Sequence, residues 1–159
     1  MRKHRMRVLA VLLGALVGFS VVSVGAVPFA HGQLWGIVTT YFDGVEQDYY
    51  IRLSFNAYDM GPEEGDDFGT LCVTAFDRGT GVLSAAFVSA DVAIVDVLPN
   101  GDVYFVAVLR LVAGSCPTEQ RRIQFWAHDG DVDGNVDTFK IGPFPVKIIR
   151  GRITAAFPF

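Results

Sequence analysis

The residues best suited to chemistry form an acidic run, HDGDVDGNVDTF, over residues 128–139. Oxygen-bearing side chains alternate along it around one glycine: Asp129, Asp131, Asp133, Gly134, Asn135 and Asp137. A calcium ion binds about six to eight oxygen atoms, and alternate carboxylates on a tightly turning backbone can converge on one ion. The pattern predicts Ca²⁺ as a cofactor, held by four carboxylates: Asp129, Asp131, Asp133 and Asp137.

Two features separate this run from an EF-hand. Position 12 of the loop is Lys140, where an EF-hand has a bidentate glutamate, and both flanks have the pattern of strands. Two interpretations therefore stay open. One is a β-hairpin with a calcium loop, and the other is a solvated hairpin turn, because turns also favour Asp and Gly.

A second acidic cluster, DMGPEEGDD, covers residues 59–67 between two predicted strands. Such a run is usually a solvated loop, and this is the interpretation that we favour. The alternative is that both loops leave the same end of the fold and share a cation.

No strong catalytic motif is present. The histidines beyond the N-terminal segment are His31 and His128, and neither lies in a G-x-S-x-G, HExxH or related pattern. We therefore expect a protein that is not an enzyme. The alternatives are a small secreted polysaccharide-acting hydrolase, which needs only two well-spaced carboxylates, and a carbohydrate-binding module. The aromatic candidates for stacking on a sugar are Trp35, Tyr49, Tyr50, Tyr58 and Trp126.

The N-terminus has the layout of an export signal. Four basic side chains lie within MRKHRMR, and an uncharged run follows from Val8 to Ala30. Val24-Gly25-Ala26 suits signal peptidase, so residues 1–26 are predicted to be a signal peptide helix. The alternative is an uncleaved signal anchor, since the apolar run is nearly long enough to span a bilayer. No later segment has that length, which predicts a secreted, extracellular product with no membrane span in the mature chain.

Without residues 1–26 the chain is strongly acidic. Nine Lys and Arg remain against 17 Asp and Glu, a formal net charge of −8. This balance argues against nucleic acid or anionic lipid as a partner, because both attract clusters of Lys and Arg. The remaining residues, 27–159, have the length of a single domain.

Two cysteines, Cys72 and Cys116, belong to this domain. Thiols oxidise outside the cell, so we expect a disulfide between them. The disulfide would close a loop of the chain, and the chain-entropy model predicts that it would stabilise the folded state by roughly 4 kcal/mol. The alternative is a pair of buried free thiols that act as small hydrophobic side chains.

Apolar residues recur at every second position beyond Gln33, which is typical of strands. In residues 48–58, Ile51, Leu53 and Phe55 alternate with polar side chains. Turn residues divide the chain into about nine strand-length segments, with hairpin turns predicted at 77–81 and 99–102. The segments are 34–42, 48–58, 69–77, 82–89, 91–98, 103–113, 121–128, 136–142 and 145–156. We expect an all-β domain, either an antiparallel β-sandwich or a barrel.

Three stretches carry a family resemblance: YYIRLSFNAY, LCVTAFDRGTGVLSAAFVSADV and FWAHDGDVDGNVDTFKI. In their order the chain resembles the post-COAP type of secreted bacterial β-domain, in which an acidic turn precedes an Asp-x-Phe strand, here Asp137-Thr138-Phe139. The resemblance implies a compact extracellular β-domain and no assigned activity. The expected function is a binding or structural role at the cell exterior, with an unknown extracellular or cell-surface partner.

Overall fold

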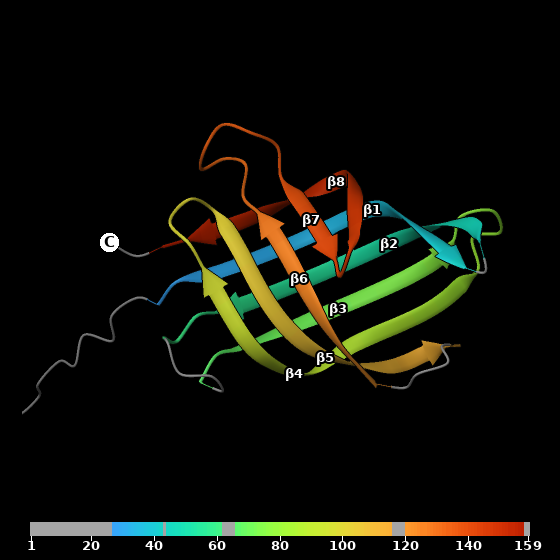
Figure 1. The fold of residues 1–159 in the computed structure, drawn as a ribbon, viewed down its shortest axis with the longest axis horizontal. Coiled ribbons are helices and arrows are strands. Elements are labelled where there is room, and N and C mark those ends of the chain that lie inside the picture. Colours follow the sequence, from blue (N-terminus) through green and yellow to red (C-terminus); the bar gives the residue numbers. More distant parts are fainter. Residues whose placement is uncertain (1–26, 43, 62–65, 116–119, 158–159) are drawn as a thin grey trace, which may run out of the picture.

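Eight antiparallel strands follow one another around a closed barrel (Figure 1). The computed structural model describes residues 27–42, 44–61, 66–115 and 120–157. The strands are β1 (Phe29–Phe42), β2 (Val45–Tyr58), β3 (Phe68–Asp77), β4 (Leu83–Val97), β5 (Asp102–Gly114), β6 (Gln120–His128), β7 (Thr138–Ile141) and β8 (Phe144–Ala156). Each strand pairs with its neighbours in sequence, and β8 pairs with β1 to close the wall. The all-β prediction is confirmed, and of the two architectures left open the chain forms the barrel.

The strand count is eight because two predicted segments, 82–89 and 91–98, form the single strand β4. The pairing of β4 with β5 shifts register between Ser89 and Asp91, so Ala90 has no partner residue in β5. Such a bulge bends a strand without ending it. The break in apolar alternation around Ala90 therefore marks a bend, and the two predicted strands were wrongly separated.

Both predicted hairpin turns are confirmed. The backbone N–H of Gly81 donates to the carbonyl of Asp77, which closes the β3–β4 turn. In the β4–β5 turn, Gly101 has a φ of 88°, a left-handed conformation that favours glycine. The Asn-Gly pair therefore forms the turn that its composition predicts.

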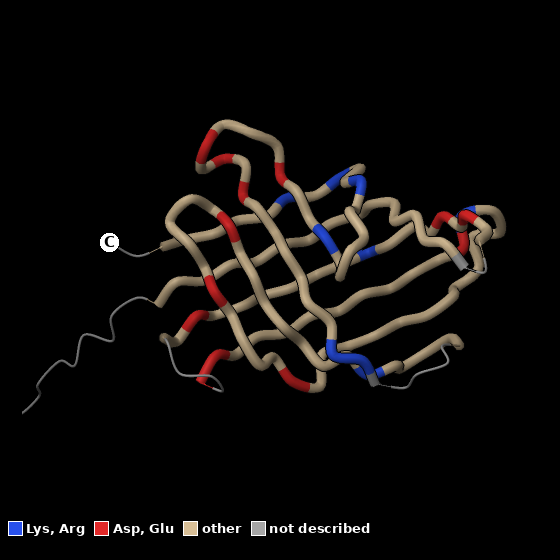
Figure 2. The backbone as a smooth tube through the Cα atoms, in the orientation of Figure 1, with Lys and Arg blue, Asp and Glu red and all other residues tan. Residues whose placement is uncertain are grey.

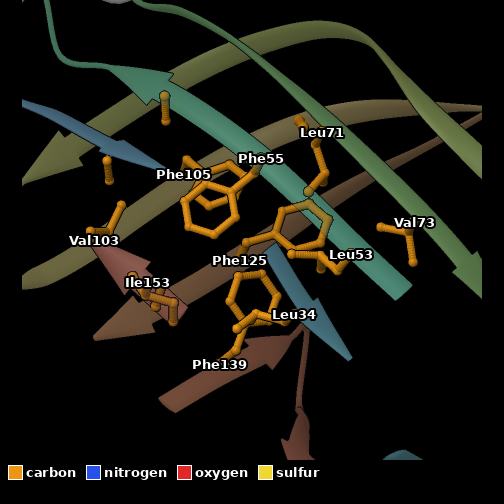
Figure 3. Packing of buried hydrophobic residues seen from close by; sticks show 14 of the residues in the cluster. Leu34, Leu53, Phe55, Leu71, Val73, Val103, Phe105, Phe125, Phe139 and Ile153 are labelled. Atoms are coloured by element: carbon orange, nitrogen blue, oxygen red, sulfur yellow. The ribbon is translucent and has the colours of Figure 1, made fainter. Parts of the chain in front are cut away.

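The barrel interior is filled by apolar side chains (Figure 3). In β2 the predicted inward residues Ile51, Leu53 and Phe55 are buried, while Arg52 between them is exposed. Four phenylalanines from different strands form the centre, with ring centroids 5.0 to 6.1 Å apart: Phe55, Phe105, Phe125 and Phe139. An eight-stranded barrel is just wide enough for side chains to fill it, so ligands must be sought on the outer wall.

At one end of the barrel, on the left in Figure 1, two strand pairings stop short. The β3–β4 pairs end at Cys72 and Val88, so β4 continues to Val97 without β3 beside it. Similarly, β7 has only 4 residues, and its pairs with β8 end at Val146. The last residues of β4 and β8 thus lack a strand partner on one side, and both acidic clusters flank this end, called here the acidic end (Figure 2).

The described residues form no helix. In that part of the chain no helix is long and apolar enough to cross a membrane. The predicted signal peptide, residues 1–26, lies outside the described residues.

Candidate functional site at the acidic end of the barrel

The loop of residues 129–137, which joins β6 to β7, is bonded to β8 by two of its carboxylates. Asp129 is 4% exposed, and its Oδ2 accepts a hydrogen bond from the backbone N–H of Ala155 at 2.8 Å. Asp137 Oδ2 accepts from the backbone N–H of Ile153 at 2.7 Å. The other oxygen of each carboxylate accepts an N–H from within the loop, from Asp131 and Gly130 respectively. These side chains therefore take the place of the missing strand beside β8.

The other two predicted calcium ligands have different partners. Asp131 forms an exposed ion pair with Arg152 of β8. Asp133 accepts from the backbone and side-chain amides of Asn135, at 3.1 and 2.6 Å, and faces His128 Nε2 at 3.1 Å. All four predicted ligands thus already accept hydrogen bonds from protein donors.

The described residues contain no group of three or more His, Cys, Asp or Glu side chains that could hold a metal ion. A calcium ion on Asp129 and Asp137 would have to share their oxygens with N–H donors of the loop and of β8, because each of these oxygens already accepts one hydrogen bond. Calcium binding by Asp129, Asp131, Asp133 and Asp137 stays a prediction.

Two aspartates of the second acidic cluster accept backbone N–H bonds from β4 in the same way. Asp67, which is 8% exposed, accepts N–H bonds from Met60 at 2.8 Å and from Val95 at 2.6 Å. Asp59 likewise accepts from Gly61 and from Val97, the latter at 3.2 Å. The solvated-loop interpretation is therefore wrong for Asp59 and Asp67. Residues 62–65 lie outside the described part of the chain.

A hollow on the outer wall lies next to the 129–137 loop. Cross-strand pairing places Trp126 of β6 between Tyr104 of β5 and Lys140 of β7. The ring centroids of Tyr104 and Trp126 are 5.5 Å apart, and their planes are inclined by 45°. The open hollow has a volume of about 540 Å³, and its lining includes these three residues together with Leu98, Asp102, His128, Thr138 and Pro143. It is called here the Trp126 hollow.

His128 lies at the rim of the Trp126 hollow between two carboxylates. Its Nδ1 is 2.8 Å from Asp102 Oδ1, and its Nε2 is 3.1 Å from Asp133 Oδ2. These contacts raise the pKa of His128, chiefly through the hydrogen bond with Asp102 and then through Asp133. The pKa of Asp133 is lowered, first by its bonds to Asn135 and also by His128. The protonated imidazole is thus the form that this arrangement favours.

The five aromatic candidates for sugar stacking do not form one platform. Trp126 lies in the hollow just described, whereas Trp35 and Tyr50 share another part of the outer wall. Tyr58 stacks on Phe68 at 4.5 Å, and Tyr49 packs against the core. Sequence reasoning missed Tyr104 and Lys140, whose alignment with Trp126 depends on the register of three strands.

The predicted disulfide remains a prediction. Cys72 is exposed on β3. Cys116 lies outside the described residues, so the structure describes no geometry for the pair.

The resemblance to post-COAP domains also stays an expectation. Its stretches fall on β2, on β3 and β4, and on β6 to β7 with the intervening loop. No family model matches the chain, and no curated protein or solved structure matches it significantly.

Proposed function

We propose that the chain is an exported, non-enzymatic binding module that holds a neutral sugar ring in the Trp126 hollow. The observation that carries the proposal is the cross-strand row in which Trp126 stands between Tyr104 and Lys140. Trp126 is 38% exposed, so part of its ring is free to contact a ligand. Sites for small ligands are typically concave and aromatic with a few polar groups that fix orientation, and this hollow has that composition.

The polar groups of the hollow suit a neutral ligand. Lys140 and protonated His128 supply two positive charges, while Asp102 at the lining and Asp133 behind His128 supply two negative ones. Thr138 adds a hydroxyl that can donate or accept. Sugar hydroxyls need donors and acceptors together beside a flat apolar face, which favours a neutral saccharide over an ion.

The hydrolase alternative receives less support from the same geometry. A glycosidase places two carboxyl groups on either side of the scissile bond. Among the described residues that line the hollow, Asp102 is the single carboxylate, and it is bonded to His128. Both imidazole nitrogens face carboxylates, which leaves His128 poorly placed as a general base.

The test is binding of neutral oligosaccharides to the protein purified after expression of the full chain. Cellohexaose, xylohexaose and mannohexaose are titrated by calorimetry against the wild type, Trp126→Ala and Trp35→Ala. We expect binding of at least one probe that Trp126→Ala weakens by about tenfold or more, consistent with the energy of one stacked ring and its burial. Trp35→Ala is the matched control and is expected to bind like the wild type.

Two results would overturn the proposal. Equal affinities of wild type and Trp126→Ala would place the sugar elsewhere on the protein, and the absence of binding to all three neutral probes would contradict a neutral-sugar site. Release of reducing ends from a probe, lost in Asp102→Asn, would instead establish the hydrolase.

A further inference from the structure

Most of the positive charge of the domain lies on one wall of the barrel. Of the nine Lys and Arg beyond residue 26, five lie on β2, on β8 or in the β3–β4 turn: Arg52, Arg78, Lys147, Arg150 and Arg152. In Figure 2 the basic segments of β8 and β2 lie close together, and Arg152 of β8 extends this group to the acidic end, where it pairs with Asp131. This wall is therefore basic, although the domain as a whole carries an excess of acidic residues.

Trp35 of β1 lies at the centre of this basic wall. Its register partners are Arg52 on β2 and Arg150 on β8, so one arginine stands on each side of it. The guanidinium carbons are 5.5 Å and 5.4 Å from the centroid of the Trp35 ring. Cation–π attraction at these distances holds both guanidinium groups close to the wall, at fixed positions.

Three of the five cations have no acidic partner among the described residues. Arg78 pairs with Asp48, and Arg152 pairs with Asp131. No described carboxylate lies within 4.0 Å of Arg52, Lys147 or Arg150. These three side chains therefore present positive charge that a ligand can neutralise.

An apolar hollow adjoins these cations. The β1–β8 pairing shifts register at Trp35 and Gly36, which leaves Ile149 as an extra residue of β8, 57% exposed. Ile149 lines an open hollow of about 590 Å³ together with Trp35, Tyr50, Phe76, Gly81 and Arg150. The hollow has aromatic walls and a guanidinium at its edge, a combination suited to a ligand with both a flat apolar face and an anionic group.

We propose that this wall is a second binding site, and that its ligand is an acidic polysaccharide. Carboxylate or sulfate groups of the glycan bind Arg52, Arg150 and Lys147, and a sugar ring packs in the hollow beside Tyr50. A guanidinium binds such groups through two parallel hydrogen bonds. Neighbouring strands are about 4.8 Å apart, so the backbones of the two arginines, one on either side of β1, lie about 10 Å apart, and the two side chains can bind separate anionic groups of one glycan chain.

A single flexible glycan chain suits this wall better than a broad anionic surface does. The acidic end flanks the wall, and Glu46, Asp48 and Asp77 lie near its other end. A bilayer or a DNA duplex would bring its charge against these acidic groups, whereas a thin chain can lie between them. The site does not rest on the Trp126 hollow, because the two hollows have no lining residue in common.

The test uses protein purified after expression of the full chain, with polygalacturonate as the charged probe and its fully methyl-esterified form as the uncharged control. Dextran sulfate, vesicles of anionic phospholipid and duplex DNA are measured in parallel. We expect binding to polygalacturonate that weakens with added salt and is absent for the ester. The double variant Arg52→Gln/Arg150→Gln should bind about tenfold more weakly or worse, because it loses charge-assisted hydrogen bonds.

Matched variants distinguish this wall from binding elsewhere on the barrel. Arg110→Gln removes an exposed cation of β5 and should leave the affinity unchanged, as should Trp126→Ala. If the double variant fails to fold, the test uses Lys147→Gln, which should bind polygalacturonate more weakly than the wild type, together with the weakening of wild-type binding by added salt. The proposal is overturned if polygalacturonate and its ester bind alike, if Arg110→Gln weakens binding as much as the double variant, or if vesicles or DNA bind more tightly than either acidic glycan.

Discussion

The buried carboxylate of Asp129 accepts a hydrogen bond at 2.8 Å from the backbone N–H of Ala155, 26 residues further along the chain. Asp67 makes the equivalent contact with the N–H of Val95 at 2.6 Å. In each case the carboxylate occupies the side of a strand where the neighbouring strand has ended. The acidic residues thus complete the hydrogen bonding of the barrel wall, and their effect on stability can be measured.

Replacing Asp129 should destabilise the fold much more than replacing Asp131. Asp129→Ala leaves the N–H groups of Asp131 and Ala155 without acceptors, at a cost of about 2–4 kcal/mol. Asp131→Ala removes only an exposed ion pair and should cost about 0–1 kcal/mol. Urea denaturation of both variants measures the difference. Equal losses would show that Asp129 does not support β8.

Calcium should have little effect on the melting temperature. Asp129 and Asp137 already accept two N–H bonds each, and these bonds hold both carboxylates against β8 and the loop backbone, so the fold does not need an ion to fix their positions. Thermal unfolding in EDTA and in millimolar Ca²⁺ or Mg²⁺ tests this expectation. A rise specific to Ca²⁺, lost in Asp131→Ala/Asp133→Ala, would instead support the calcium site predicted from the sequence.

His128 should make the stability of the acidic end depend on pH. Its pKa is raised in the folded state, so its contribution is fully present below the unfolded-state value of about 6.5. That contribution is lost as the pH rises through the higher folded-state pKa. The free energy of unfolding, measured from pH 5 to 9, should therefore fall more steeply in the wild type than in His128→Gln. His31→Gln, on β1, is the control, and parallel profiles of wild type and His128→Gln would contradict the assignment.

Replacing Gly101 with alanine should destabilise the fold more than replacing Gly44 with alanine. Both residues have positive φ, 88° and 77°, so alanine suffers similar backbone strain at each, about 1–2 kcal/mol. At Gly101 a Cβ would also lie 2.8 Å from the carbonyl oxygen of Asp129, whereas nothing lies within 4 Å at Gly44. Gly101→Ala should thus be the less stable variant by chemical denaturation. Equal stability would mean that the 129–137 loop does not pack on the β4–β5 turn.

Local sequence patterns predicted the strands because alternation is a local property. Ile51, Leu53 and Phe55 face the core as expected, and Gly101 forms the predicted turn. Closure of the barrel could not be predicted in this way, because it depends on the register and tilt of all strands together. The bend at Ala90 was missed for a related reason: a bulge and a chain reversal both interrupt the alternation.

The role of the aspartates was equally hidden from the sequence. A calcium ion and a backbone N–H both bind a carboxylate oxygen, so the spacing of Asp129 and Asp137 is compatible with either partner. Only the position of Ile153 and Ala155 beside the loop distinguishes the two. The Trp126 hollow likewise depends on strand register, since Tyr104 and Lys140 are remote from Trp126 in sequence.

The central claim, that a sugar binds beside Trp126, can be tested by tryptophan fluorescence. The chain has 2 tryptophans, so Trp35→Phe leaves Trp126 as the single reporter, and Trp126→Phe leaves Trp35. Titration of both variants with the neutral oligosaccharides should produce a saturable change in emission from Trp126 and none from Trp35. A change confined to Trp35, or the absence of any change at Trp126 with every probe, would contradict the account.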